Sequence, residues 1–247
     1  MLRSGPLDAR QVHLWVVRLE AAQDDFARSL GYLSEDETAR AKRFYFDRHR
    51  RAFVLGRAAL RVLLANYLDA GPAELRFQYG QQGKPALAGT AGSLRFNVSN
   101  SGNLAAYAFT TGCEIGVDIE QHRALHDFEN IADRFFSPQE TVELLALPDA
   151  EKNSAFFNCW ARKEAYIKAM GGGLAIPLDS FRVTLRPQDA ARMVSIAESE
   201  DAARGWTLHD FTPAPDYAGA IAYPDEPRVL QARPVVAVDE LLERCPI

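Results

Sequence analysis

An internal repeat constrains the fold of this chain more strongly than any other feature of its sequence. Three features occur twice, each second copy 103 residues after the first: predicted strands at 13–19 and 116–122, capping-box helix starts at Ser34 and Ser137, and long predicted helices at 53–67 and 156–170. A single shift that aligns three features indicates two structural units of the same kind. The sequence therefore predicts two similar α/β halves related by a pseudo-twofold axis.

The predicted fold class is α+β, and in each half we expect an antiparallel sheet packed on the long helix. We place the N-terminal half at residues 1–112 and the C-terminal half at 113–247. Glycine and proline predict a loop at 80–85, and three glycines at 171–173 end the second long helix. The 247 residues are enough for two small units with cores of their own.

The composition is that of an ordinary globular protein, with 47% hydrophobic and 25% charged residues. No apolar run approaches the roughly 20 residues that span a bilayer, and the first eleven residues do not resemble a signal peptide. Three cysteines, Cys113, Cys159 and Cys245, lack metal-ligand spacing and leave one thiol unpaired. We expect a cytoplasmic protein that does not enter a membrane.

Acidic side chains in the second half are spaced so that they can share one pocket. Asp118 and Glu120 project from the same face of the strand, because strand side chains alternate. Trp160, Glu164 and Lys168 lie one turn apart along one stripe of the helix. Three carboxylates suit a hard divalent cation such as Mg²⁺, which commonly shares its site with phosphate oxygens. The pattern predicts metal-dependent transfer from a phosphoanhydride, with the lysine neutralising a leaving phosphate.

Each of these features also has a purely structural interpretation. An Asp-x-Glu pair on a strand is commonly a solvated face. Glu164 and Lys168 stand in the i, i+4 order that stabilises a helix, and Trp160 is by default a core aromatic. The joint arrangement, rather than any one residue, favours a site.

The net charge of −5 is unevenly distributed along the chain. Residues 40–61 contain eight Lys or Arg and only one acid, Asp47, so this basic block carries +7 and the remainder carries −12. Such a block attracts phosphates or an acidic partner, or else forms a solvated helix face. Nucleic acid is not expected as a partner, because the whole chain is acidic and contains no known nucleic-acid module.

Taken together and in order, the motifs resemble those of the Sfp-type 4′-phosphopantetheinyl transferases. The matching segments are Gly83-Lys84-Pro85, Phe96-Asn97-Val98-Ser99-Asn100-Ser101-Gly102, Gly116-Val117-Asp118 with Glu120, Phe135-Phe136-Ser137, Trp160-Ala161-Arg162-Lys163-Glu164-Ala165 with Lys168, and Gly173-Leu174 to Pro177-Leu178-Asp179-Ser180-Phe181. The resemblance extends from about Ser34 to about Leu185.

The resemblance implies transfer of 4′-phosphopantetheine from coenzyme A to a serine of an apo acyl or peptidyl carrier protein, with Mg²⁺ (or Mn²⁺) as cofactor. It implies Asp118, Glu120 and Glu164 as metal ligands and Asp118, Glu164 and Lys168 as catalytic residues, with Glu164 acting as ligand, as base, or as both. Because each chain supplies both sides of a cleft, we expect a monomer. The residues expected to bind coenzyme A are Arg43, Arg48, Arg51, Lys84, Pro85, Ser99, Asn100, Lys163 and Lys168.

One position departs from the family pattern. Asn100 stands where the family commonly has a histidine that helps to bind a coenzyme A phosphate, and an amide carries no positive charge. Asn100 leaves open a carrier-binding homologue with impaired catalysis. A Mg²⁺-dependent phosphohydrolase of coenzyme A, which would use the same acids with water as the acceptor, also stays open.

The repeat predicts a single catalytic site. At the shift of 103 residues, Asp118 aligns with Trp15, Glu120 with Val17, and Glu164 with Arg61, so the first half has no acid at these positions.

Next to the cations of the basic block, the aromatic residues 44–46 are expected to form either a partner surface or part of the core.

Overall fold

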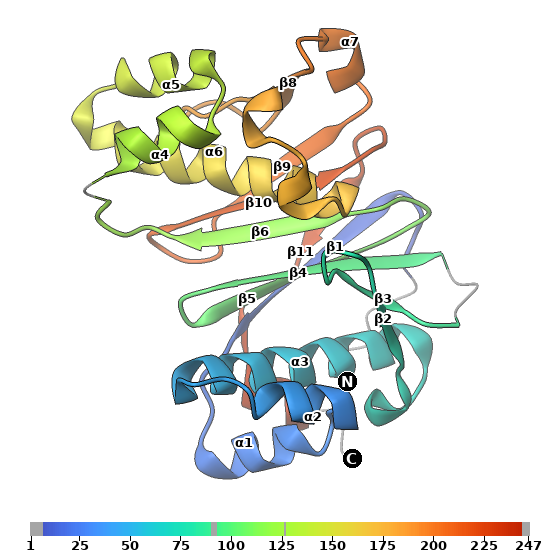
Figure 1. Ribbon diagram of the computed structural model, residues 1–247. Helices are drawn as coiled ribbons and strands as arrows, with labels where there is room; N and C mark the ends of the chain where they lie inside the picture. The colour runs from blue at the N-terminus through green and yellow to red at the C-terminus, as the bar shows by residue number, and fades with distance from the viewer. Residues whose placement is uncertain (1–6, 90–92, 126, 244–247) are drawn as a thin grey trace.

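The computed structural model describes residues 7–89, 93–125 and 127–243 and has the expected mixed architecture (Figure 1). Cys245 lies outside the described residues. The first half contains β1 (Gln11–Arg18), α1 (Gln23–Leu30), α2 (Glu35–Ala41), α3 (Asp47–Leu68), η1 (Pro72–Glu74), β2 (Phe77–Tyr79), β3 (Pro85–Leu87), β4 (Leu94–Ser101) and β5 (Leu104–Thr111).

The second half repeats this order of elements, with η2 and α7 added. It contains β6 (Gly116–Gln121), α4 (Phe128–Phe135), α5 (Pro138–Leu145), α6 (Asp149–Met170), η2 (Gly173–Ala175), η3 (Leu178–Ser180), β7 (Phe181–Val183), β8 (Met193–Ile196), α7 (Glu200–Ala203), β9 (Thr207–Phe211) and β10 (Tyr217–Tyr223). The tail adds β11 (Val229–Ala232), β12 (Val236–Ala237) and α8 (Val238–Glu243).

The two halves stack as four layers, with a helix layer outside each of two central sheets (Figure 1). The antiparallel strand order β1-β5-β4 of the first sheet corresponds to the order β6-β10-β9 of the second. One apolar core lies under α3, another lies under α6, and a third fills the space between the sheets with side chains such as Val16, Val117 and Ile221. The predicted fold class, an antiparallel sheet on a long helix in each half, is confirmed.

The repeat is real, but its shift is not constant along the chain. Between β1 and β6 a shift of 103 residues fits the register, because Arg18 of β1 and Gln121 of β6 stand at the same end of the strand pairs β1–β5 and β6–β10, opposite Leu104 and Tyr217. The long helices are instead shifted by 102 residues, since α3 starts at Asp47 and α6 at Asp149. The segment between the capping box and the long helix is therefore one residue shorter in the second half.

Two buried ion pairs identify the residues that correspond between the long helices. Arg61 Nε donates to Glu37 Oε2 at 2.7 Å, and its Nη1 donates to two backbone carbonyls that flank η1. Lys163 Nζ lies 2.7 Å from Glu140 Oε2 and donates to two carbonyls that flank η3. The predicted alignment of Arg61 with Glu164 was wrong by one residue: Arg61 corresponds to Lys163.

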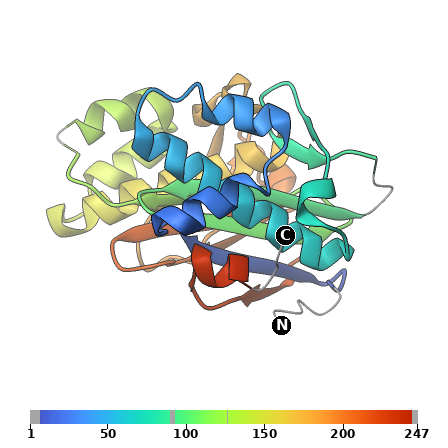
Figure 2. The same ribbon diagram turned by 90° about the horizontal axis from the view of Figure 1, so that it is seen from below.

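The division at residue 113 placed the tail in the second half, but the tail packs on the first half. β11 and β12 pair with β1 in parallel, and α8 packs its apolar face into the core under α3. Arg28 Nη2 donates to Leu242 O at 2.9 Å and fixes the end of α8. Figure 2 shows α8, in red, near the N-terminal helices. The physical reason is that β1 would otherwise present an unpaired edge. Within the described ranges, every helix is too short or too polar to cross a bilayer.

Candidate active site

A glycine brings the strand and the helix of the predicted site into direct contact. A Cβ atom at Gly116 would collide with Ala165 O and Ala169 N of α6. Only a residue without a side chain lets β6 lie this close to the helix backbone. The close approach places the α6 stripe that carries Glu164 and Lys168 over the β6 face that carries Asp118.

Asp118 is the centre of the resulting cluster and is buried. Its Oδ1 atom lies 2.6 Å from Lys168 Nζ and accepts a hydrogen bond from Ser99 Oγ at 2.8 Å. Lys168 Nζ also donates to Ser99 Oγ at 3.0 Å. A carboxylate, an ammonium and a hydroxyl thus form a closed triangle contributed by β6, α6 and β4.

The seam between the two halves runs through this site. Alternate side chains of β4 point to β6: Asn97 Oδ1 accepts from Val117 N at 2.9 Å, and Ser101 Oγ donates to Glu120 Oε2 at 3.1 Å. β4 and β6 belong to different sheets, so side chains rather than backbone bonds join them here. The first half therefore reaches into the acid cluster through Ser99 and Ser101.

Burial raises the pKa of each of the three acids in the cluster. Burial raises the pKa of Asp118, and the nearby Lys168 and Ser99 oppose that rise. Burial also raises the pKa of Glu120, and the Asp118 carboxylate adds to the effect. The pKa of Glu164 is raised by burial and further by Asp118 and Glu120, while Lys168 lowers it. Asp118 thus raises the pKa of both glutamates, and Lys168 lowers the pKa of all three acids.

The donor set fits a hard divalent cation. Asp118 Oδ2 is buried and has no hydrogen-bond partner among the described residues. A cation held by Asp118, Glu120 and Glu164 would satisfy that oxygen and relieve the repulsion among the three acids. Across 7–89, 93–125 and 127–243, no three His, Cys, Asp or Glu side chains form a ready-made metal centre. In the arrangement seen, Lys168 and Ser99 occupy Asp118 Oδ1.

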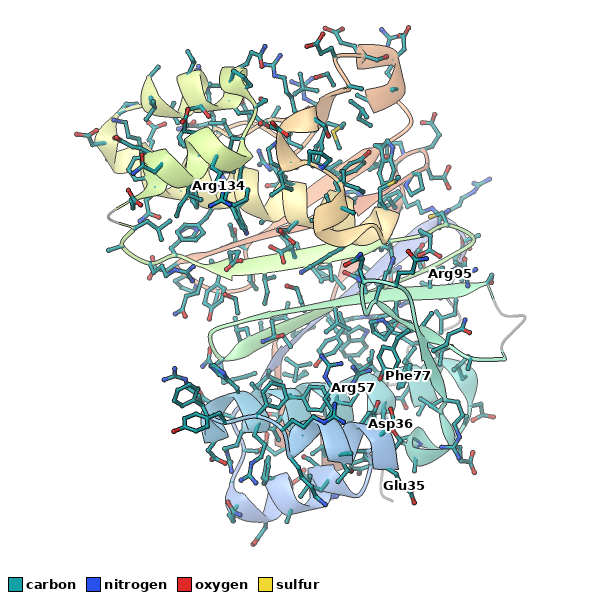
Figure 3. The ribbon with its side chains drawn as sticks, in the orientation of Figure 1. Glu35, Asp36, Arg57, Phe77, Arg95 and Arg134 are labelled. Atoms are coloured by element: carbon teal, nitrogen blue, oxygen red, sulfur yellow. The ribbon has the colours of Figure 1, made fainter. Side chains whose placement is uncertain are left out.

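Lys84 and Pro85 lie where a nucleotide could enter the seam. Lys84 Nζ lies 2.9 Å from Glu114 Oε2 and donates to Ile115 O, just before β6, and to Ala169 O near the end of α6. Both residues line an open pocket of about 400 Å³. Tyr79, Phe96 and Arg95 also line it, and Figure 3 shows Arg95 at the seam.

The other predicted cations are dispersed. Arg43 lines an open hollow of about 700 Å³ together with Arg40 and Phe44. Arg48 is exposed, with its guanidinium 5.1 Å from the Phe46 ring centroid. The structure does not bring Arg51 to the seam, because its Nη2 donates to Ala21 O and its guanidinium lies 4.5 Å from the Phe26 ring centroid.

Lys163 and Asn100, both expected to bind coenzyme A, lie outside the acid cluster. Lys163 is fully buried. Its amine pairs with Glu140 and donates to two backbone carbonyls, so it is not available to a phosphate. Asn100 is exposed, and strand alternation puts it on the opposite face of β4 from Ser99. Of the β4 pair expected to bind coenzyme A, only Ser99 joins the cluster.

Sequence reasoning included Arg57 and Ser101 in its segments but gave neither residue a role of its own. Arg57 lies 3.5 Å from Glu37, and its guanidinium lies 5.2 Å from the Phe77 ring centroid. Figure 3 shows Arg57 and Phe77 close together. Its Nη1 atom is buried and has no partner within the described part of the chain. The signal for Arg57 was its place in the basic block, four residues before Arg61. Ser101 lies two residues after Ser99, and strand alternation could have pointed to it.

Comparison with known proteins places this chain in a family. A sequence model of the 4′-phosphopantetheinyl transferase superfamily matches residues 114–222, and a model of the 4′-phosphopantetheinyl transferase N-terminal region matches residues 18–112. The chain is 39% identical over 214 residues to the 4′-phosphopantetheinyl transferase HetI of Nostoc sp., covering 86% of this chain and 87% of HetI.

A second relative extends over nearly the whole chain. The 4′-phosphopantetheinyl transferase Sfp of Bacillus subtilis is 30% identical over 221 residues, covering 90% of this chain and 95% of Sfp. The chain belongs to the 4′-phosphopantetheinyl transferase family, as its motifs had indicated.

Proposed function

We propose that this protein transfers the 4′-phosphopantetheine group of coenzyme A to a serine hydroxyl of an apo acyl or peptidyl carrier protein. The serine Oγ forms a bond to the β-phosphorus of the coenzyme A diphosphate, and the bond from that phosphorus to the leaving 3′,5′-adenosine diphosphate breaks. The observation that carries the proposal is the triangle of Asp118, Lys168 and Ser99 beside Glu164, at a seam that both halves line.

The metal of this reaction would be Mg²⁺, with Mn²⁺ as a substitute. Asp118, Glu120 and Glu164 would hold it, as the unpartnered Asp118 Oδ2 supports. When bound, such an ion polarises the phosphoryl group and offsets the charge of the diphosphate.

Lys168 and Glu164 have separate tasks in this proposal. The Lys168 ammonium is about one-quarter exposed, so it reaches the site from its bond with Asp118 and can stabilise charge on the leaving diphosphate. The serine proton needs a base, and the Glu164 carboxylate, one helical turn before Lys168 on α6, is the acid that we assign to accept it. Glu164 accepts the proton directly or through water, in addition to its place among the metal ligands.

The nucleotide end of coenzyme A would occupy the pocket at Lys84 and Pro85. Tyr79 and Phe96 offer aromatic surface for a base, and Lys84 and Arg95, which share Glu114 as their acidic partner, leave a net positive charge there. The hollow at Arg40 and Arg43 is a second basic surface of the same half and is suited to a phosphate. Asn100, on the outer face of β4, would contribute an uncharged amide at most.

The protein would act as a monomer in the cytoplasm. Support for the monomer comes from the site itself, to which β4 of one half and β6 and α6 of the other contribute within one chain. Support for the cytoplasm comes from a cysteine pattern that leaves an odd thiol.

Intact mass spectrometry of an apo carrier protein tests the proposal. The carrier is incubated with this protein, coenzyme A and Mg²⁺, and parallel samples contain EDTA. We expect a gain of one phosphopantetheinyl group that EDTA prevents. Release of phosphopantetheine without a carrier would indicate a phosphohydrolase, and absence of any gain across several carrier types would contradict the proposed transfer.

A further inference from the structure

The Lys84 ammonium is fully engaged by bonds within the protein. Its Nζ atom lies 2.9 Å from Glu114 Oε2 and donates to Ile115 O at 3.1 Å and to Ala169 O at 3.3 Å. An ammonium has three N–H donors, and these three acceptors use all of them. The side chain is only 17% exposed. A phosphate could therefore bond to Lys84 only by displacing one of the three acceptors.

The three acceptors lie on two separate segments of the second half. Glu114 and Ile115 belong to the segment that joins the halves, directly before β6, whereas Ala169 is in the last turn of α6. Lys84 itself comes from the loop between β2 and β3 of the first half. One ammonium therefore ties the first half both to the start of β6 and to the end of α6.

A second contact holds the same loop against the end of α6. A Cβ atom at Gly173 would lie 2.9 Å from Gln82 Cγ, so the turn that follows α6 packs closely on the loop. The last four carbonyls of a helix lack partners within the helix, and Lys84 bonds to that of Ala169. Its positive charge also complements the negative end of the helix dipole. The loop thus secures the C-terminal end of α6.

The last turn of α6 carries Lys168, directly before the Ala169 carbonyl to which Lys84 is bonded. Lys168 Nζ lies 2.6 Å from Asp118 Oδ1 at the centre of the acid cluster. Helix ends fray, and an opened turn would shift the Lys168 backbone and withdraw its ammonium from the diphosphate. A misplacement of about 1 Å can cost on the order of a hundredfold in rate.

We propose that Lys84 is a positioning residue, whose ammonium latches the last turn of α6 to the first half and thereby fixes Lys168. This inference rests on the proposed function, and it gives Lys84 a role other than direct contact with a phosphate of coenzyme A. Lys84 and Pro85 still line the pocket, and the ammonium still adds to its charge. Lys84 acts on the reaction through Lys168.

Hydrogen exchange in the last turn of α6 tests the latch in the protein without ligands. In Lys84→Met, the amide hydrogens of residues 168–170 should exchange about tenfold faster than in the unchanged protein, because the turn opens more often. Lys152→Met is the matched control: Lys152 Nζ lies 2.7 Å from Asp149 at the other end of α6, and its side chain is 20% exposed. This control should leave exchange at 168–170 unchanged. Equal exchange in Lys84→Met and the unchanged protein would overturn the proposal.

A double-mutant cycle tests whether Lys84 acts through Lys168. Lys84→Met should lower kcat about tenfold and change the Kd for coenzyme A less than about threefold. In the Lys168→Met background, Lys84→Met should lower kcat no further, because the group that it positions is already absent. Effects on kcat that multiply would show independent action, and a Kd raised about tenfold with kcat preserved would indicate a phosphate contact. Either result would overturn the proposal.

A charge-conserving variant separates the latch from the charge of the pocket. Lys84→Met combined with Glu114→Gln removes one positive and one negative charge that lie 2.9 Å apart. This double variant should show the same fast exchange at 168–170 as Lys84→Met. Glu114→Gln alone keeps both carbonyl bonds of Lys84 and should exchange as the unchanged protein does. Normal exchange in the double variant would contradict the latch.

The latch and the proposed function can fail separately. If the unchanged protein transfers nothing to any carrier, the proposed function fails. The exchange experiment needs neither carrier nor coenzyme A, so it still decides: faster exchange in Lys84→Met supports the latch, and unchanged exchange overturns it. If Lys84→Met does not fold, Lys84→Gln, which is uncharged and keeps two N–H donors, takes its place in the same comparisons.

Discussion

The two halves share their buried framework and differ in what they present to the seam. Arg61 with Glu37 in the first half corresponds to Lys163 with Glu140 in the second, and both cations also hold the turn that follows the long helix. On the strands of the two central sheets, the residues at corresponding positions differ. The first half places Trp15, whose Nε1 donates to Tyr67 OH, where the second places Asp118.

The difference shows that the fold is repeated while the chemistry is not. The positions that hold helix to sheet and helix to turn carry equivalent interactions in both halves. The positions that face the long helix are aromatic and apolar in one half and acidic in the other. With the helix shift of 102 residues, Glu164 corresponds to Val62, which is fully buried. The first half keeps a core where the second half has its site.

The largest expected effect is the loss of activity when the central acid of the second half, which the first half lacks, is replaced. Asp118→Asn should lower kcat on the order of 10³-fold, because it removes the charge at the centre of the cluster. The free energy of unfolding should change little, since the change also removes a buried charge. Glu143→Gln, a surface acid paired with Arg186, is the control. Near-normal turnover of Asp118→Asn at saturating Mg²⁺ would place the site elsewhere.

The shared framework is tested by removing its cations one half at a time. Lys163→Met and Arg61→Met should each lower the free energy of unfolding by about 3 kcal/mol or more, because each takes from a buried glutamate the cation 2.7 Å away, although Arg57 remains 3.5 Å from Glu37. Urea unfolding measures both. Adding Glu140→Gln to Lys163→Met should restore part of the loss. A small effect in one half alone would mean that the two ion pairs are not equivalent.

Lys168 distinguishes catalysis from binding at the seam. Lys168→Met should lower kcat about a hundredfold while the KM for coenzyme A changes much less, since the ammonium acts on charge that develops on the leaving group. Steady-state kinetics with varied coenzyme A separates the two constants. The reverse pattern, a raised KM with kcat preserved, would assign Lys168 to ground-state binding of the diphosphate.

A smaller effect concerns His13, whose position in the strand repeat corresponds to Gly116. Burial lowers the pKa of His13, and Arg233 lowers it further, so the folded protein favours the neutral ring. The stability that this provides is present above the unfolded pKa near 6.5 and is lost as the pH falls from there toward the lower folded pKa.

Unfolding in urea at pH 7.5 and pH 5.5 measures this contribution of His13. The unchanged protein should lose more stability than His13→Asn over that interval. An equal loss in both proteins would show that His13 does not contribute to the acid sensitivity of the first half.

The sequence predicted the parts of the molecule that depend on local periodicity. Alternation along 116–120 put Asp118 and Glu120 on one face, helical spacing put Glu164 and Lys168 on one stripe, and the structure joins Asp118 to Lys168 at 2.6 Å. The capping boxes at Ser34 and Ser137 are both present. These features follow from residues close together in the chain.

The parts that could not be predicted depend on residues far apart. Nothing local to Ser99 or Ser101 indicates that β4 would lie beside β6 of the other half, and the pairing of β11 with β1 joins the two ends of the chain. The shift of one residue between the long helices comes from the length of one connecting segment, which a periodic pattern does not register. The sequence suggested Lys163 as a phosphate ligand, because its three buried partners lie far from it along the chain.

The most direct test of a single site in the second half is the number of metal ions that each chain binds. Mn²⁺ is titrated into the protein with coenzyme A present and followed by electron paramagnetic resonance, with coenzyme A alone as the blank. We predict one protein-dependent Mn²⁺ per chain, lost in Glu164→Gln and in Asp118→Asn. Two ions per chain, or one that persists in both variants, would contradict the assignment of the chemistry to Asp118, Glu120 and Glu164.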